Sequence, residues 1–282
     1  MSEDPTQLAC TACSWSNDKQ TRCSYSSHVK LFYGAGDRGV WQIGTDYILK
    51  ERPSSPASNE TRTVKFISHH TNIPIPKVLN SWVDDDHRHF TLLERIKGQT
   101  MQEAWSTLSQ SDKEHIADQV ADGVRQLRQF SSSVMQNLDG GPLYSGWLFL
   151  NGSETPYGPL DSHEELQESM ALALKDLPTT VTDLFKGRVP AGAPYTLSHG
   201  DLNSQNIMLA IRYPVWWEYT ATTIGFGEDD AEWKYLLRQR LDPYEHARQF
   251  WLDFYSLSMY PEHDERGQQV IRELKPENAL TL

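Results

Sequence analysis

The residues best suited to carry chemistry lie in the segment HGDLNSQNI, which contains Asp201 and Asn206. They have the spacing D-x-x-x-x-N, which is typical of phosphoryl-transfer loops. In such a loop the Asp accepts the proton of an attacking hydroxyl, and the Asn holds a magnesium ion that bridges the nucleotide phosphates. The flanking stretches YTL and NIML are apolar, so the motif is predicted to be a loop between buried segments. The alternative is a surface turn rich in Asp and Asn.

A second candidate group lies upstream, around Lys50. Lys50 ends the run YILK, and a Lys at the end of an apolar strand can reach the α- and β-phosphates of a nucleotide. It then needs an acidic partner, and Glu60 in the first turn of a predicted helix is the natural choice. The alternative for each residue alone is a solvated Lys and a first-turn Glu favoured by the helix dipole. The Asp201 loop downstream favours the phosphate-binding interpretation.

Three glycines upstream of Lys50, Gly34, Gly36 and Gly39, form the pattern G-x-G-x-x-G. Glycines let backbone N–H groups approach phosphates closely. A predicted β-hairpin follows this pattern, whereas a helix follows it in a dinucleotide-binding fingerprint. The segment from Glu94 to Ile96 is expected to join two lobes, and its backbone could bond an adenine edge.

The predicted elements change in character along the chain. Residues 1–27 are polar and are expected to form a flexible arm. Residues 28–95 contain mostly strands with one helix, whereas residues 96–282 are mainly helical. We therefore predict an α+β fold with a small β-rich amino-terminal lobe, which would bind a nucleotide, and a larger helical carboxy-terminal lobe. The segment LLERIKG would connect them.

Several local patterns predict caps and buried faces. Two capping boxes are predicted, one from Ser111 and Glu114 and one from Ser162 and Glu165. The expected buried faces of the helices that follow contain Ile116, Val120, Val124 and Leu127 in the first, and Leu166, Met170 and Leu174 in the second. In the strand HFTLLERI, three residues are expected to be buried: Phe90, Leu92 and Leu93.

Composition excludes several classes of function. The 282-residue chain carries a net charge of −12, which disfavours nucleic-acid binding because phosphate contacts need a basic face. No apolar run approaches the roughly 20 residues of a membrane helix. The start MSEDPTQLAC has none of the basic and apolar stretches of a signal peptide. We therefore expect a cytoplasmic monomer without a nucleic-acid or membrane partner.

The three cysteines all lie near the amino terminus. Cys10, Cys13 and Cys23, with His28, form a possible zinc ligand set. Structural zinc ligands usually come as two tightly spaced pairs, and here only Cys10 and Cys13 are paired in this way. The favoured interpretation is an arm with free thiols.

Several segments together resemble the aminoglycoside phosphotransferase-like family of the protein-kinase-like superfamily, particularly its large fungal set. They are ILKE, FISHHTNIPIPKVL, FTLLERIKGQTMQEAW, PYTLSHGDLNSQNIML and YPVWWEYT. The resemblance implies that Asp201 is the catalytic base, Asn206 a magnesium ligand, Lys50 a phosphate ligand and Glu60 its ion-pair partner. It also implies ATP and Mg²⁺ as cofactors. Family members phosphorylate hydroxyls of small molecules, so the implied partner is a small-molecule hydroxyl acceptor.

The chain departs from the family pattern directly after the loop. A second acidic motif similar to IDWE is expected there, with an Asp that binds the magnesium ions. Here no Asp or Glu occurs between Asp201 and Glu218. The few residues before Pro214 cannot form two strands and a turn, so we infer an internal deletion near residues 209–213. Ordinary strand and turn lengths give it a size of about 15–20 residues.

Two functions therefore stay open. The first is an ATP-dependent phosphotransferase that acts on a small-molecule hydroxyl and is impaired by the loss of the metal-binding Asp. The alternative is a catalytically inactive kinase-like binding or scaffold protein. Glu218, Asp229 or Asp230 could replace the lost carboxylate, but packing and capping roles are favoured for them. A single strand leading directly to a helix at Trp216 is expected.

Overall fold

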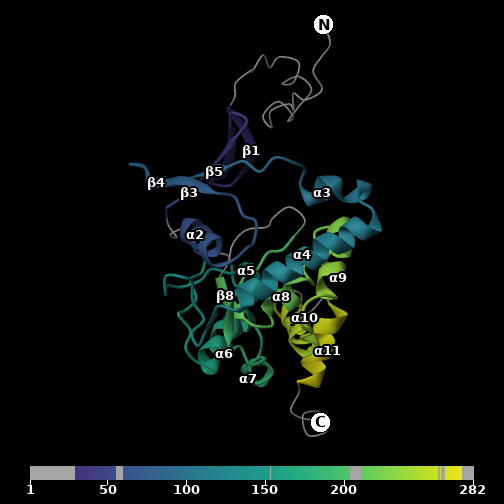
Figure 1. Ribbon diagram of the computed structural model, residues 1–282. Helices are drawn as coiled ribbons and strands as arrows, with labels where there is room; N and C mark the ends of the chain where they lie inside the picture. The colour runs from purple at the N-terminus through teal and green to yellow at the C-terminus, as the bar shows by residue number, and fades with distance from the viewer. Residues whose placement is uncertain are drawn as a thin grey trace, which may run out of the picture. The chain divides into compact units, whose positions relative to one another are not determined.

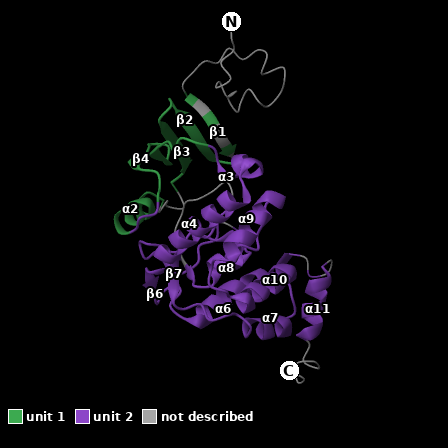
Figure 2. Cartoon of the chain, turned by 45° about the vertical axis from the view of Figure 1, so that its right-hand side comes forward, with its two compact units in different colours: residues 1–70, 74–98 green, residues 71–73, 99–282 purple. Residues whose placement is uncertain are grey.

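The computed structural model of the chain describes residues 29–54, 60–152, 154–203, 211–259, 261 and 264–274. The chain divides into two compact units (Figure 2). The first comprises residues 1–70 and 74–98, and the second comprises residues 71–73 and 99–282. Strands dominate the first unit and helices the second (Figure 1). This confirms the predicted α+β fold, with a small β-rich part and a larger helical part.

The first unit is an antiparallel sheet with the strand order β1-β2-β3-β5-β4 and one helix, α2. Its elements are β1 (Val29–Ala35), β2 (Arg38–Ile43), β3 (Tyr47–Pro53), α2 (Glu60–His70), β4 (Val78–Val83) and β5 (Arg88–Glu94). The predicted hairpin is formed by β2 and β3, whose last pair joins Ile43 to Tyr47. Gly44 lies in the turn with φ of 63°, a conformation that costs glycine little.

Strand β5 buries a different set of residues from the predicted one. Thr91 and Leu93 are buried, whereas Phe90 and Leu92 are only partly buried. Successive side chains of a strand point to opposite faces, so a run of apolar letters cannot all face one core. On the other face Phe90 stacks against Trp82 of β4, with ring centroids 5.3 Å apart. The prediction was therefore wrong for Phe90 and Leu92 and right for Leu93.

The second unit contains helices and one small sheet. Its helices are α3 (Met101–Ala104), η2 (Trp105–Thr107), α4 (Gln110–Arg128), α5 (Gly146–Phe149), α6 (His163–Ala171), η3 (Leu172–Leu174), α7 (Thr179–Lys186), α8 (Trp217–Ala221), α9 (Glu228–Arg238), α10 (Glu245–Met259) and α11 (Glu265–Glu273). The sheet has the order β6-β7-β8, formed by β6 (Ser131–Ser132), β7 (Tyr195–Ser198) and β8 (Ile211–Pro214).

Helix α4 begins two residues earlier than the capping pattern predicted. Its N-cap is Ser109, which forms a complete capping box with Asp112. The prediction of Ser111 with Glu114 was therefore wrong, because the same S-x-x-acid pattern occurs twice in overlapping registers. For α6 the predicted N-cap Ser162 is confirmed, but the predicted box is incomplete, because the Glu165 carboxylate accepts from the N–H of Asp161 at 2.8 Å.

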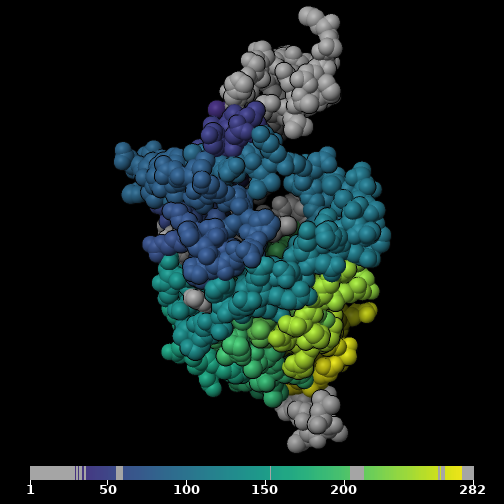
Figure 3. All heavy atoms as spheres, in the orientation of Figure 1, coloured from purple at the N-terminus to yellow at the C-terminus, as the bar shows by residue number. Residues whose placement is uncertain are grey.

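The buried face of α4 also differs from the predicted one. Its buried residues are Ala117, Ala121, Val124 and Leu127. Val124 and Leu127 were predicted correctly, whereas Ile116 and Val120 are only partly buried and two alanines are buried in addition. In the space-filling view, α4 and α9 lie next to each other (Figure 3), and the two helices pack directly. Trp105 and Trp233 meet edge to face in the same core, with ring centroids 6.2 Å apart.

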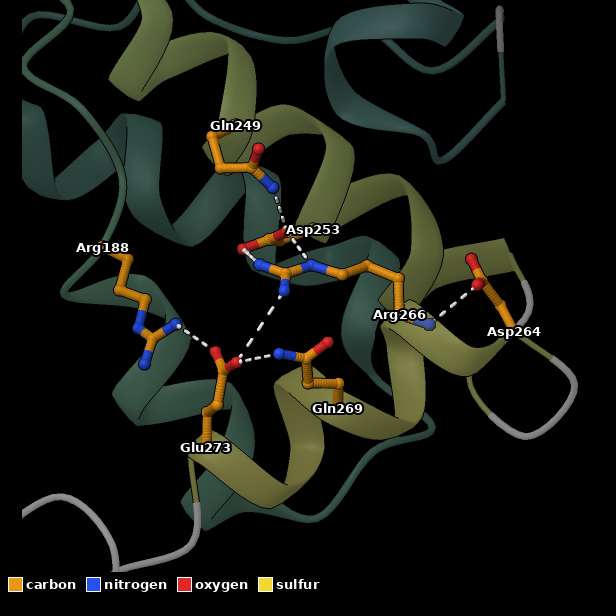
Figure 4. A network of polar contacts seen from close by, with 7 residues as sticks. All are labelled: Arg188, Gln249, Asp253, Asp264, Arg266, Gln269 and Glu273. Atoms are coloured by element: carbon orange, nitrogen blue, oxygen red, sulfur yellow. Dashed lines mark hydrogen bonds and ion pairs between the residues drawn. The ribbon is translucent and has the colours of Figure 1, made fainter.

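The carboxy-terminal helix α11 is fastened to α10 by a polar network (Figure 4). Arg266 donates two hydrogen bonds to the carboxylate of Asp253, at 2.7 and 2.9 Å. Gln249 donates to the same carboxylate at 2.9 Å. Bidentate pairing of this kind fixes the relative rotation of the two side chains. A cavity of about 680 Å³ adjoins this network, and its lining includes Asp253 and Glu273.

Candidate functional site

Lys50 and Glu60 form an ion pair inside the first unit. Lys50 lies on β3, where it pairs with Val40 on one side and Thr91 on the other. Glu60 is the first residue of α2 and is only 5% exposed. A buried carboxylate needs such a partner, because removing a charge from water is costly unless it is paired. The pair holds the Lys50 ammonium at a defined place on the sheet.

The three glycines lie on the β1–β2 hairpin. Gly34 and Gly39 face each other across the strands, and Gly36 lies in the turn with φ of 57°. A Cβ on Gly39 would come within 2.8 Å of Nε1 of Trp41, so a side chain there would displace the indole. Glycine is thus required locally at two positions, and a backbone free of side chains is also what a phosphate cradle needs.

The segment from Glu94 to Ile96 begins at the last residue of β5. The backbone N–H of Glu94 donates to the Lys77 carbonyl at 2.9 Å. The N–H of Arg95 donates to the Asp46 carbonyl at 2.8 Å, so the segment is held on both sides. The N–H and C=O of one strand residue point to the same side. The Glu94 carbonyl therefore faces the Lys77 side, and the Ile96 side chain is exposed.

The loop that carries Asp201 follows β7 and is anchored from two helices. The carboxylate of Glu218 on α8 accepts hydrogen bonds from the backbone N–H groups of His199 and Gly200, the second at 2.9 Å. Nε1 of Trp233 on α9 donates to the carbonyl of Leu202 at 3.0 Å. Both anchors are buried, so the loop backbone is fixed on either side of Asp201.

The Asp201 side chain is exposed and held at its base by its neighbours. Oδ1 accepts a hydrogen bond from Nδ2 of Asn203 at 2.8 Å. The backbone N–H of Asp201 donates to Nδ1 of His199 at 3.2 Å, so that nitrogen is the unprotonated one. Burial lowers the pKa of His199 to about 3, which keeps the imidazole neutral. The loop therefore presents one oriented carboxylate without a neighbouring positive imidazole.

Glu218 is a residue whose role the sequence did not reveal. The favoured prediction was only that Glu218 lies in a helix packed by Trp216 and Trp217. It is 2% exposed, and burial raises the pKa of its carboxyl group, while the two backbone N–H groups and Arg128 act in the opposite direction. An acidic residue inside an apolar WWEY run is the one signal that could have indicated a buried polar function.

Gly200 is required by the backbone and by a neighbour. Its φ of 78° lies in the region that side chains disfavour. A Cβ at this position would come within 2.7 Å of Cε2 of Tyr213, an aromatic carbon of a buried ring. The glycine before Asp201 thus lets the Tyr213 ring pack directly against the loop.

The candidate metal ligand Asn206 lies outside the described residues, as do Cys10, Cys13, Cys23 and His28. Within the described residues, no group of three or more His, Cys, Asp and Glu side chains could hold a metal ion. From residue 211 onward, β8 passes through Val215 and Trp216 directly into α8, whereas residues 204–210, on which the predicted single strand also depends, lie outside the described residues.

The carboxylates that could replace the missing one have other roles. Glu218 binds the backbone of the loop, as described above. Asp230 forms a buried ion pair with Lys234 at 3.0 Å. Asp229 is exposed in the first turn of α9, where the helix dipole favours an acidic residue. The carboxylates of Glu218 and Asp230 are therefore already committed to protein partners.

Comparison with known proteins identifies the family. A profile of the phosphotransferase enzyme family matches residues 30–214, more than half of the chain. The chain belongs to this family. A search of curated proteins finds no match. Within the described residues, no helix is both long and apolar enough to cross a membrane.

Solved structures of aminoglycoside phosphotransferases share the fold of this phosphotransferase-family chain. A point mutant of aminoglycoside 2′-phosphotransferase-IIIa with GDP aligns with a TM-score of 0.54 and 15% identity, over 93% of this chain and 95% of that one. APH(2″)-Ib with ADP gives 0.53 and 15%, over 91% and 93%. The streptomycin–ATP complex of APH(2″)-IIa gives 0.52 and 14%, over 88% and 90%. Identities this low establish the fold alone.

Proposed function

We propose that the chain is an ATP-dependent phosphotransferase that acts on a hydroxyl group of a small molecule, with turnover impaired by the loss of a metal-binding carboxylate. The observation that carries the proposal is the anchored loop that presents Asp201. Two buried side chains, Glu218 and Trp233, hold its backbone on either side of one exposed carboxylate. Family membership gives this arrangement its chemical meaning.

In this proposal each unit supplies one part of the chemistry. Lys50, held by Glu60, binds the α- and β-phosphates, and the glycine hairpin offers backbone N–H groups to the same phosphates. The carbonyl of Glu94 and the backbone of Ile96 bind the adenine edge. Asp201 orients the acceptor hydroxyl and accepts its proton as the oxygen attacks phosphorus. ATP, when bound, supplies the phosphoryl group.

The donor set of the described residues does not fit a magnesium ion. Magnesium is usually held by one or two carboxylates together with substrate phosphates. Beyond the loop, Glu218 and Asp230 already have protein partners, and the sequence has no Asp or Glu between Asp201 and Glu218. Removing one electrostatic group from such a site costs about 3 kcal/mol, or on the order of 100-fold in rate. We attribute the missing carboxylate to an internal deletion near residues 209–213.

The same feature favours a second candidate function, a catalytically inactive binding or scaffold protein. Such a protein would keep the Lys50–Glu60 pair and the anchored loop but transfer no phosphate. The two functions differ in whether Asp201 matters for turnover.

The deciding experiment is a rate measurement on the full chain. ATP hydrolysis and transfer to a panel of hydroxyl compounds are measured with magnesium for the wild type and for Asp201→Asn. We expect slow turnover in the wild type and a loss of at least about 100-fold in the variant, because a positioned base contributes on that order. Equal rates in the two proteins, or no turnover in either, would overturn the proposal in favour of the inactive protein.

A further inference from the structure

Two large aromatic side chains of the second unit lie exposed and in contact. Trp147 on α5 is 41% exposed and Phe226, just before α9, is 53% exposed. Their rings meet edge to face, with centroids 6.0 Å apart and an interplanar angle of 69°. Apolar rings are unfavourable in contact with water, and exposed apolar patches commonly mark binding sites.

The Phe226 side of this pair is rigidly supported. The backbone N–H of Phe226 donates to Oδ2 of Asp230 at 3.0 Å. Nζ of Lys234 donates to the carbonyl of Ile224 and lies 5.1 Å from the centre of the Phe226 ring. The side chains of Lys234 and Asp230 are only 5% and 3% exposed. A buried ion pair thus holds an exposed aromatic ring in place.

The Trp147 side borders an apolar cavity. Its volume is about 370 Å³, and its lining residues are Gly146, Trp147, Leu150, Gly152, Tyr255 and Met259. None of these carries a charge. The backbone of Trp147 is fixed, because its carbonyl accepts a hydrogen bond from Nε1 of Trp251 at 2.9 Å. This volume is within the usual range for small-molecule pockets, and its chemistry suits an uncharged apolar group.

A short series of contacts joins this surface to the loop that carries Asp201. The ring of Tyr213 packs against Gly200, the residue before Asp201. Burial raises the pKa of Tyr213, and the neighbouring Ser145 hydroxyl acts in the opposite direction, so the two side chains lie close to each other. Ser145 caps α5 by accepting a hydrogen bond from the N–H of Leu148 at 3.2 Å, and Trp147 lies in the same helix. Trp147 therefore lies on a short helix whose N-cap is a neighbour of Tyr213, the residue that packs against the loop.

We propose that Trp147, Phe226 and the adjoining cavity bind the uncharged aromatic or alicyclic body of the hydroxyl acceptor. This inference rests on the proposed function and specifies the substrate class of that site. Aromatic faces stack on flat apolar rings and gain about 0.5–1.5 kcal/mol beyond the burial of area. A polycationic acceptor would need carboxylates, and the lining residues of the cavity provide none.

The test measures binding without ATP, so that it does not depend on turnover. 2-Naphthol serves as the uncharged ring alcohol and streptomycin as the polycation, with affinities measured by calorimetry and saturation-transfer NMR. We expect 2-naphthol to bind more tightly than streptomycin, and Trp147→Ala and Phe226→Ala each to weaken its binding at least tenfold. Trp82→Ala is the matched control, because Trp82 is 39% exposed and stacked on Phe90 in the first unit, and it should bind as the wild type does.

The outcomes separate the two proposals. Unchanged affinity in both Trp147→Ala and Phe226→Ala, or tighter binding of streptomycin, would overturn the acceptor class and leave the phosphotransferase proposal standing if ATP turnover depends on Asp201. If 2-naphthol binds and both variants weaken its binding, but no turnover is detected, the phosphotransferase proposal alone is contradicted. Phe226 is exposed, so its truncation tests the surface even if Trp147→Ala fails to fold.

Discussion

At the scale of single residues, the loop depends on two buried ionisable groups whose neutral forms are favoured. Burial lowers the pKa of His199 and raises the pKa of Glu218. The two groups therefore act oppositely on stability as the pH falls. For His199, acidification protonates the unfolded chain before the folded one. Its contribution to stability is therefore lost as the pH falls. For Glu218, the folded state keeps its proton to higher pH than the unfolded chain, so its contribution is lost as the pH rises.

The His199 contribution can be isolated by substitution. Its folded pKa is about 3 against an ordinary value of 6.5. Between these values the unfolded state binds a proton that the folded state does not, so this group lowers the free energy of unfolding by about 1.4 kcal/mol per pH unit as the pH falls. Urea denaturation of the wild type and of His199→Asn is measured at pH 6, 5.5 and 5. The difference between their free energies of unfolding should approach this slope. Identical slopes in the two proteins would contradict the burial argument.

The candidate site residues also show how far a sequence can identify a site. The pairing of Lys50 with Glu60 was predicted from the order of a strand and a helix and is confirmed, although Lys50 lies in the middle of β3 and not at its end as predicted. The contact between Glu218 and the loop joins residues 18 and 19 positions apart and depends on how α8 packs. No local pattern encodes that contact, so residue types alone predicted only the helix.

At the scale of elements, the type of each element was predictable from periodicity, whereas its register was not. In β5 the buried face contains Thr91 and Leu93, although the opposite face, with Phe90 and Leu92, is more hydrophobic. In α4 two overlapping S-x-x-acid patterns offer Ser109 and Ser111 as caps, and the helix begins after Ser109. The local pattern could not separate the two caps, and the buried face of β5 depends on packing, which is a tertiary property.

Ser109, which caps α4, and Ser111, which was predicted to cap it, offer a matched pair of variants. The hydroxyl of Ser109 accepts a hydrogen bond from the N–H of Asp112 at 3.2 Å, and Asp112 bonds back to Ser109. Ser109→Ala should therefore cost about 1 kcal/mol of stability, the usual value of an N-cap. Ser111 lies inside the helix, so Ser111→Ala should change the free energy of unfolding by less than about 0.5 kcal/mol. Chemical denaturation checks both, and the reverse order would show that the helix begins at Ser111.

At the scale of the whole molecule, each of the two units holds a different part of the proposed chemistry. The first unit holds the Lys50–Glu60 pair and a glycine hairpin on its sheet. The second holds the anchored loop of Asp201 and the proposed acceptor surface of Trp147 and Phe226. In our proposal the missing metal carboxylate impairs the transfer step and not phosphate binding by Lys50, so nucleotide binding is the property to measure first.

The most direct measurement is calorimetric titration of the full chain with ATP and magnesium. We predict that the wild type binds, that Lys50→Ala weakens binding at least tenfold, and that Lys97→Ala changes it less than twofold. Lys97 is the matched control, since its side chain is 78% exposed and pairs with Asp46 at the surface of the same unit. The double variant Lys50→Ala with Glu60→Gln avoids a buried unpaired charge and should bind as weakly as Lys50→Ala. Wild-type affinity in that double variant, or no binding by the wild type, would contradict the account.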